Sequence, residues 1–205
     1  MDTKSLPTKN NLLKIKNSIK QSQEGQMLLE QKKMILQREL ERYLDEEQKL
    51  REYGQRILEE ALYFLKIANI EIGIDEMIDI SDGIKIDNNI DIKYKTIMGV
   101  EIPSIIPEES NITINYGLYN TTSSVDEAIL RFIDVKKYIL DLAQIENTIY
   151  RLQKNIEKVQ RRSNALKEII IPSDEKLAAK IQEILDENEK EEFIRLKRLK
   201  HRQNL

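Results

Sequence analysis

The sequence predicts a mainly α-helical protein, in which the N- and C-terminal arms form a long antiparallel two-helix coiled coil with a small β-containing cap between them. In both arms apolar residues recur at alternating steps of three and four, whereas in the middle they recur at every second position. Composition agrees, because 34% of residues are charged and 5% aromatic, which suits helices with one narrow buried stripe. We expect an N-terminal helix over 1–69, the cap over 70–118 and a C-terminal helix over 119–205.

The first arm shows a heptad pattern that continues from Leu12 to Ala68. Twelve of its seventeen core positions are apolar, against 40% hydrophobic residues in the whole chain. Such enrichment predicts a helix that packs along a partner helix, with a length of roughly 85 Å at 1.5 Å per residue. The five other core positions favour register specification or close packing of small residues. They are Ser22, Gln26, Lys33, Glu47 and Gly54.

The second arm repeats the pattern from Val125 to Ile170, with one change of phase between Leu142 and Ile145. Pro172 follows, and we expect it to interrupt or kink the helix, because proline lacks a backbone N–H and its ring clashes one turn back. The pattern resumes beyond this proline, so both arms predict long helices. The resumed core positions are Leu177, Ile181, Ile184, Leu185, Phe193, Leu196 and Leu199.

The middle of the chain has a different period. Isoleucines alternate with polar residues over 70–94, which predicts strands, and Asp82-Gly83 fits a two-residue turn between them. A further short strand is predicted over 111–116. Residues 71–110 are acidic, with 3 Lys/Arg against 10 Asp/Glu. A small cap between two helical arms predicts a hairpin with both termini at its far end.

No pattern in the sequence predicts a chemical site. There is no Cys and His201 is the only histidine, which excludes the usual cysteine and histidine metal clusters and the usual catalytic triads. No glycine-rich phosphate loop is present. Acidic clusters such as 45–47 have helical spacing and predict a solvated face. We therefore predict no catalytic residue, no cofactor, no metal and no enzymatic activity of its own.

The basic run 195–202 is the strongest charged feature, and taken alone it suggests nucleic acid or anionic lipid. Acidic residues precede it and it has no aromatic residue for stacking, so a helix end that fits a protein collar is favoured. No apolar stretch approaches the roughly 18 residues of a transmembrane helix, and no secretory signal is present. We expect a cytoplasmic protein, without nucleic acid or membrane insertion, which reaches a membrane only through other proteins.

Three separated motifs carry a family resemblance. The first contains Pro7-Thr8-Lys9, Leu12-Leu13, Gly25 with Leu28-Leu29, and Lys32-Lys33; the second is 97–103, Ile-Met-Gly-Val-Glu-Ile-Pro. The third contains Arg161-Arg162-Ser163-Asn164-Ala165-Leu166, Ile171-Pro172, Leu185-Asp186-Glu187 and Glu191 to Lys197. In this order, and over nearly the whole chain, they are similar to the D subunit family of the V-type (V/A-type) ATPases.

The resemblance implies a non-catalytic rotor shaft in the central stalk. Its terminal helices would enter a ring of catalytic A and B subunits, while its lower part would hold the F subunit and contact a socket subunit above the membrane ring. The shaft would transmit torque between ATP chemistry in the ring and H⁺ or Na⁺ transport in the membrane. We expect partner contacts at Pro7, Thr8, Lys9, Gly25, Arg161, Arg162, Asn164, Arg195, Lys197 and Arg198.

Two other classes of protein remain as alternatives. A prefoldin-like chaperone also joins coiled-coil helices through β-hairpins, although its helix ends expose apolar rather than basic residues; another coiled-coil scaffold is a related possibility. An enzyme is the second alternative class, and hydrolysis of ATP by the purified chain would support it. Copurification separates a rotor from a chaperone, because a rotor binds A, B and F subunits whereas a chaperone forms a hexamer.

Overall fold

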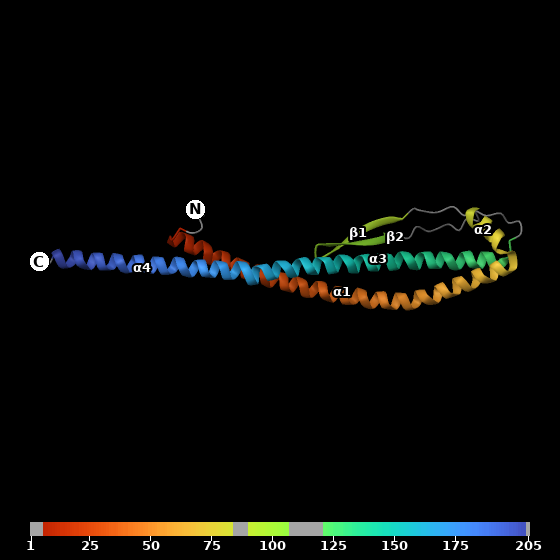
Figure 1. Ribbon diagram of the computed structural model, residues 1–205, viewed down its shortest axis with the longest axis horizontal. Helices are drawn as coiled ribbons and strands as arrows, with labels where there is room; N and C mark the ends of the chain where they lie inside the picture. The colour runs from red at the N-terminus through yellow and green to blue at the C-terminus, as the bar shows by residue number, and fades with distance from the viewer. Residues whose placement is uncertain (1–5, 84–89, 107–120, 204–205) are drawn as a thin grey trace. The chain divides into compact units, whose positions relative to one another are not determined.

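The computed structural model describes residues 6–83, 90–106 and 121–203, without the side chains of 201–203. The chain divides into two compact units, and Figure 1 labels its helices and strands. The terminal unit comprises residues 1–35 and 156–205, and the middle unit comprises residues 36–155. The elements are α1 (Lys9–Ile72), α2 (Ile74–Gly83), β1 (Asp91–Ile97), β2 (Val100–Ile106), α3 (Ser123–Ala165), the π-helix η2 (Leu166–Ile170) and α4 (Ile171–Gln203).

Helix α1 confirms the heptad prediction for the first arm. All seventeen predicted core positions from Leu12 to Ala68 are buried or half-buried. The helix ends before Gly73, whose φ of +103° is a left-handed conformation that glycine adopts without steric cost. The N–H of Gly73 donates to the carbonyl of Asn69 at 3.1 Å. The heptad pattern therefore specifies the buried stripe of α1, and Gly73 specifies where the helix ends.

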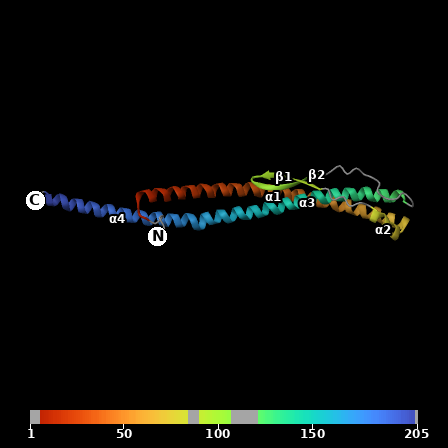
Figure 2. The same cartoon turned by 90° about the horizontal axis from the view of Figure 1, so that it is seen from above.

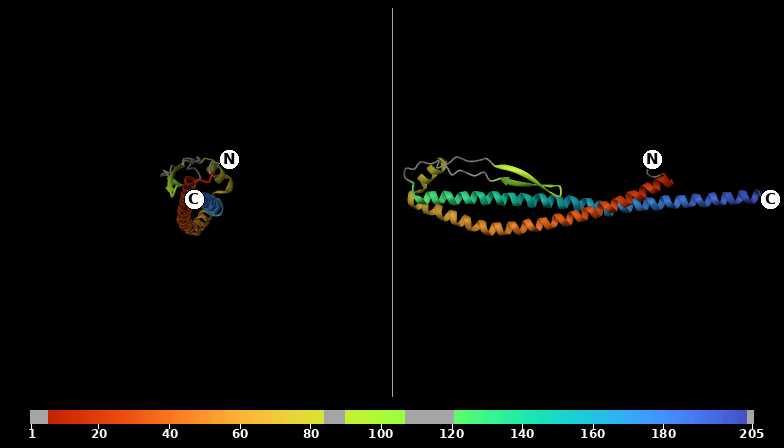
Figure 3. Two further views of the ribbon diagram at one scale, coloured as in Figure 1. Left: turned by 90° about the vertical axis from the view of Figure 1, so that its left-hand side faces the viewer. Right: turned by 180° about the vertical axis from the view of Figure 1, so that it is seen from behind.

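In the terminal unit the beginning of α1 packs against α4 (Figure 3). Leu12 and Ile15 form a buried cluster with Ala178 and Ile181, and three half-buried residues extend it: Ile19, Leu177 and Leu185. Two polar contacts give the direction of the pair, Lys16 to Gln182 at 3.4 Å and Ser18 to Asp174 at 3.2 Å. Because the α4 partner numbers fall as the α1 numbers rise, the two helices run antiparallel.

In the middle unit α1 and α3 are also antiparallel neighbours (Figure 2). Arg51 binds Glu146 at 2.6 Å, and Arg131 lies 3.6 Å from Glu60. Arg131 also lies over the ring of Phe64, 5.4 Å from its centroid. These contacts confirm that the C-terminal arm returns along the N-terminal arm, as the fold prediction requires.

Pro172 changes the helix without ending it. The π-helix η2 directly precedes α4, in which Pro172 is the second residue, and the N–H of Ile171 donates to the carbonyl of Leu166, five residues back. A wider turn suits a proline, because the missing N–H and the ring both oppose the usual bond one α-turn back. The expected interruption is therefore a π-turn between two continuous α-helical segments.

The prediction of strands over residues 70–83 is wrong, because α1 continues to Ile72 and α2 covers Ile74–Gly83. Ile70, Ile74 and Ile78 are spaced by four, so the same isoleucines that alternate at period two also fit one face of a helix. Asp75 and Glu76 lie in the first turn of α2, where negative charge interacts favourably with the positive end of the helix dipole. The predicted turn at Asp82-Gly83 is consequently the end of α2, and the strand predicted over 111–116 lies outside the described residues.

The β-hairpin lies later in the cap than predicted. Strands β1 and β2 pair antiparallel from Asp91 opposite Ile106 to Ile97 opposite Val100. The two-residue loop consists of Met98 (φ +50°) and Gly99 (φ +78°), which is the pattern of a type I′ turn. In Figures 1 and 3, β2 lies between β1 and α3.

Candidate partner-binding surfaces

All ten predicted contact residues belong to the terminal unit. Thr8 acts first as a helix cap: the N–H of Asn11 donates to its Oγ1 at 3.2 Å, and the N–H of Leu12 donates to its carbonyl at 3.0 Å. This is the usual chemistry of a threonine N-cap. Pro7 and Thr8 are exposed, so both can face a partner, but the Pro-Thr-Lys motif also has a structural reason.

Lys9 pairs with the other helix of the same unit. Its Nζ lies 2.6 Å from Oε1 of Glu189, with 77% and 59% of the two side chains exposed. The hydrogen bond and the charge of Glu189 raise the pKa of Lys9 above its usual value. Exposed pairs of this kind contribute little to stability, so the pair orients the two side chains more than it stabilises the helices.

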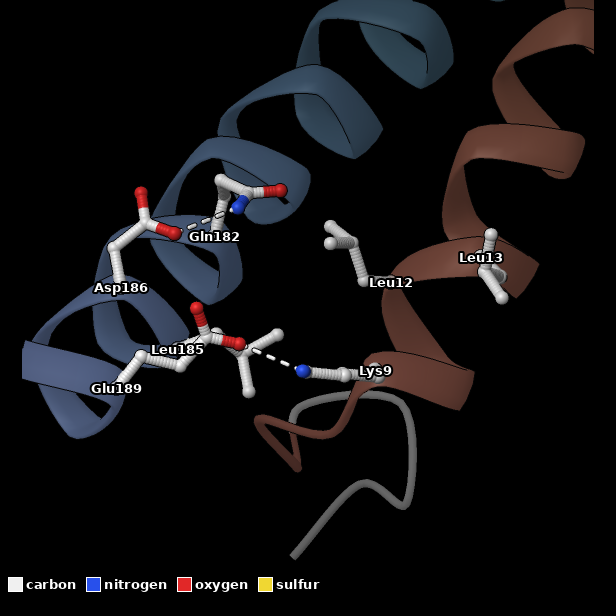
Figure 4. A pocket seen from close by; sticks show the side chains of 7 residues that line it. All are labelled: Lys9, Leu12, Leu13, Gln182, Leu185, Asp186 and Glu189. Carbon is white, nitrogen blue, oxygen red and sulfur yellow. Dashed lines mark hydrogen bonds and ion pairs between the residues drawn. The ribbon is translucent and has the colours of Figure 1, made fainter. Parts of the chain in front are cut away.

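A cavity of about 300 Å³ lies between the first turns of α1 and the facing turns of α4 (Figure 4). Leu12 reaches toward α4, and the Lys9–Glu189 pair closes one side. On α4, Gln182 Nε2 donates to Asp186 Oδ1 at 2.9 Å. The lining residues are Lys9, Leu12, Leu13, Gln182, Leu185, Asp186 and Glu189. Apart from Lys9, none of these residues was predicted as a partner contact. Leu12, Leu13, Leu185 and Asp186 belong to the family motifs, which could have indicated them.

Beyond the cavity, every described side chain of α4 over 190–200 is exposed. This part carries apolar side chains with exposed fractions between 50% and 67%: Phe193, Ile194, Leu196 and Leu199. It also carries the predicted basic contacts. Arg195 pairs with Glu191 one turn back at 3.4 Å, whereas no ion pair is found for Lys197 or Arg198 within the described parts of the chain. Apolar and basic side chains together make this segment suitable for a protein partner.

The remaining predicted contacts lie nearer the middle of the two helices. Arg161 binds Glu157 at 3.3 Å and is 79% exposed, and Asn164 accepts a hydrogen bond from Gln160 at 2.6 Å. Arg162 is also exposed. At Gly25 a Cβ would meet nothing within 4 Å. The packing of the chain itself therefore does not explain why glycine occupies this helical position.

No group of histidine, cysteine, aspartate and glutamate suited to a metal ion occurs among the described residues. Over the same residues, no helix is both long enough and apolar enough to cross a bilayer.

The comparisons with known proteins agree with one another. A family model described as the ATP synthase D subunit matches residues 11–201. The chain is 36% identical over 196 residues to the V-type ATP synthase D subunit of Thermotoga neapolitana, covering 96% of this chain and 97% of that protein. It is 40% identical over 197 residues to the A-type ATP synthase D subunit of Pyrococcus horikoshii, covering 95% and 92%.

A more distant relative gives the same result. The A-type ATP synthase D subunit of Methanopyrus kandleri is 34% identical over 199 residues, covering 95% of this chain and 84% of that protein. The resemblance found in the three motifs is thus confirmed over almost the full length. The chain belongs to the family of ATP synthase D subunits.

Proposed function

We propose that the protein is the central-stalk rotor shaft of a V/A-type ATP synthase. It transmits torque between ATP hydrolysis or synthesis in the A/B ring and H⁺ or Na⁺ transport in the membrane ring. Membership in a family named for a component of ATP synthase supports a place in a rotary ATPase. The same membership favours this role over that of a prefoldin-like chaperone.

The observation that carries the proposal is the antiparallel pairing of two helices with different sequences. Cross-helix contacts hold α1 to α4 in the terminal unit and α1 to α3 in the middle unit. Such a pair has unequal sides. As the two helices turn together, they present each surrounding pair of A and B subunits with different contacts. These contacts bias the subunit pair toward an open or a closed state. ATP chemistry belongs to the A and B subunits in this mechanism, so the chain itself is not catalytic.

The exposed part of α4 supports an assignment to the ring. We place the collar contact at Lys9, Arg195, Lys197 and Arg198, together with the exposed apolar residues beside them. Pro7, Thr8, Gly25, Arg161, Arg162 and Asn164 are further proposed contacts. The F subunit and the socket subunit would bind elsewhere on the chain. The complex would hold the protein at the cytoplasmic side of the membrane without inserting it.

A reversible crosslink tests the rotation. The chain contains no cysteine, so Arg161→Cys supplies a single thiol at an exposed position, and a second cysteine is placed in the facing ring subunit. In the assembled complex, we expect disulfide formation to stop sustained ATP hydrolysis and reduction to restore it. The Arg161→Cys complex without the second cysteine, treated with the same oxidant, is the control. Undiminished hydrolysis in the fully crosslinked complex would refute a rotating shaft.

A truncation tests the collar contact separately. Removal of residues 195–205 takes away all three basic residues proposed for α4, and we expect weaker coupling between ATP hydrolysis and ion transport in the assembled complex. The triple substitution Arg195→Ala, Lys197→Ala and Arg198→Ala retains the helix length and separates charge from length. Unchanged coupling in both variants would remove the collar assignment while leaving the shaft proposal intact.

A further inference from the structure

The two edges of the β-hairpin differ in a way that the rotor proposal does not use. A two-stranded hairpin is marginal in water unless other groups complete it. Each of its strands has an outer edge whose backbone N–H and C=O groups need partners.

The register shows which residues form these edges. Because the loop has two residues, Ile97 and Val100 are a hydrogen-bonded pair, and bonded and non-bonded pairs alternate from there. On β2 the outward backbone groups are therefore those of Glu101, Pro103 and Ile105. On β1 they are those of Ile92, Tyr94 and Thr96.

The outer edge of β2 is closed at all three positions. The N–H of Ile105 donates to Oε1 of Gln144 at 2.6 Å, and Pro103 has no N–H to donate. Arg151 Nη1 donates to the carbonyl of Glu101 at 3.2 Å. Helix α3 and one proline thus prevent any strand from pairing with this edge.

The outer edge of β1 is open within the described residues. Ile92, Tyr94 and Thr96 are exposed, and no hydrogen bond from their outward backbone groups is found in the described parts of the chain. Three alternate positions suffice for a short added strand, since each offers a donor and an acceptor. Of the two edges of the hairpin, only the outer edge of β1 can therefore accept a partner strand.

Side chains indicate which strand would fit. Lys93 and Lys95 project from one face of β1 and have no ion pair among the described residues. Ile92 and Tyr94 project from the other face, with 50% and 57% of each side chain exposed. A second copy of β1 paired about Tyr94 would bring Lys93 opposite Lys95, which like charges oppose. An acidic strand is attracted by the same lysines.

We propose that β1 accepts an extended segment of a second protein as a third strand, and that this segment alternates acidic with apolar side chains. The acidic residues face Lys93 and Lys95, and the apolar residues face Ile92 and Tyr94. Backbone hydrogen bonds supply affinity and the alternation supplies register. This inference is independent of torque transmission, because it concerns a fixed attachment to the hairpin.

The first test uses the full chain and a synthetic seven-residue peptide in which valine and glutamate alternate. Amide NMR shifts are followed up to millimolar peptide, where we expect saturable changes at Ile92, Tyr94 and Thr96 with small changes at Gln144 and Arg151. Replacing glutamate by glutamine in the peptide should weaken binding about tenfold, as expected for two lost charge pairs. A peptide N-methylated at every residue, which has no N–H left to donate to β1, should not bind. Absence of shifts at β1, or equal binding of the glutamine peptide, would overturn the proposal.

Matched variants test the edge itself. Thr96→Pro removes an outward N–H that is not part of the hairpin ladder, as Pro103 does naturally on β2, and should abolish binding. Thr96→Val keeps that N–H and should bind like the unmodified chain. The amide shifts of Val100 and Ile102 report whether the hairpin remains intact. Binding by a folded Thr96→Pro variant would contradict strand addition.

The assembled complex provides the second measurement. Amide hydrogen exchange at Tyr94 and Thr96 should slow at least tenfold in the complex relative to the isolated chain, because a third strand protects those groups. Exchange at these two amides that is the same in both states would show that the edge has no partner there. Failure of this test leaves the rotation experiment unaffected, so the two proposals are separable.

Discussion

Two glycines in α1 show how differently the same residue can act in one helix. A Cβ at Gly54 would lie 1.9 Å from the ring of Tyr138, whereas a Cβ at Gly25 would meet nothing within 4 Å. Gly54 is therefore required by close packing, as its place among the core positions suggested, and Gly25 is not required by any contact among the described residues. Both glycines cost conformational entropy in a helix.

The two positions predict opposite effects of the same substitution. Gly25→Ala should raise the free energy of unfolding of the isolated chain by about 0.5–1 kcal/mol, because alanine favours the helix and the space is free. Gly54→Ala should lower it by about 1 kcal/mol or more, since the Tyr138 ring must move. Urea unfolding measures both values. If the clash is the cause, Gly54→Ala becomes stabilising in a Tyr138→Ala background.

Glu71 predicts a pH-dependent contact near the end of α1. Hydrogen bonds from Ser124 and Thr122 lower the pKa of its carboxyl below the usual value. A lowered folded pKa gives stability that is present above the unfolded pKa and lost as pH falls through the folded pKa. The Tm difference between the unmodified chain and Glu71→Gln should therefore shrink below about pH 4. In a background with Thr122→Val and Ser124→Ala, which lacks both donors, this pH dependence of the difference should disappear.

At the scale of elements, side chains of α3 hold the hairpin in addition to the pairing of its own two strands. Arg151 donates to the Glu101 carbonyl and lies 5.3 Å from the centroid of the Tyr94 ring, so one side chain contacts both strands. Gln144 holds Ile105. This explains how a two-stranded sheet with an exposed first strand stays ordered against a helix.

Arg151→Ala should therefore loosen the hairpin with little effect on the helices. Amide exchange at Val100 and Ile102 should accelerate at least tenfold, as expected when local opening becomes easier, while the melting midpoint followed by far-UV CD changes little. Lys154→Ala on the same helix is a suitable control, because Lys154 contacts the Tyr150 ring of α3 itself. Equal protection of the hairpin amides in both variants would show that Arg151 does not anchor the hairpin.

At the scale of the whole molecule, the proposed shaft function depends on the antiparallel return of the chain. Spin labels at positions 16 and 182, which face each other in the terminal unit, should give a short distance by double electron–electron resonance. Moving the second label to position 198 should lengthen it by about 24 Å, at 1.5 Å per residue. A pair at positions 51 and 146 tests the middle unit in the same way. A parallel pairing with 16 beside 182 would leave 51 and 146 far apart, so short distances at both pairs are expected only of antiparallel helices.

The sequence by itself determined the two helical arms, the buried stripe of α1 and the family. Six core positions predicted for the second arm are instead exposed: Phe132, Ile139, Ile170, Phe193, Leu196 and Leu199. The arms and the stripe follow from local periodicity, since every predicted core position of α1 is buried or half-buried. The family follows from motifs that extend over nearly the whole chain. The sequence pattern wrongly predicted strands over residues 70–83, because isoleucines spaced by two and by four fit both a strand and a helix. Period alone does not distinguish the two when the segment is short.

Only the tertiary structure decided which residues meet. The pairing of Lys9 with Glu189, the approach of Tyr138 to Gly54 and the closure of the β2 edge by Gln144 and Arg151 join residues far apart in sequence. Heptad positions specify a buried face but many registers satisfy them, so partners depend on the packing of both helices together. For the same reason, the open edge of β1 became visible only once the opposite edge was seen to be closed.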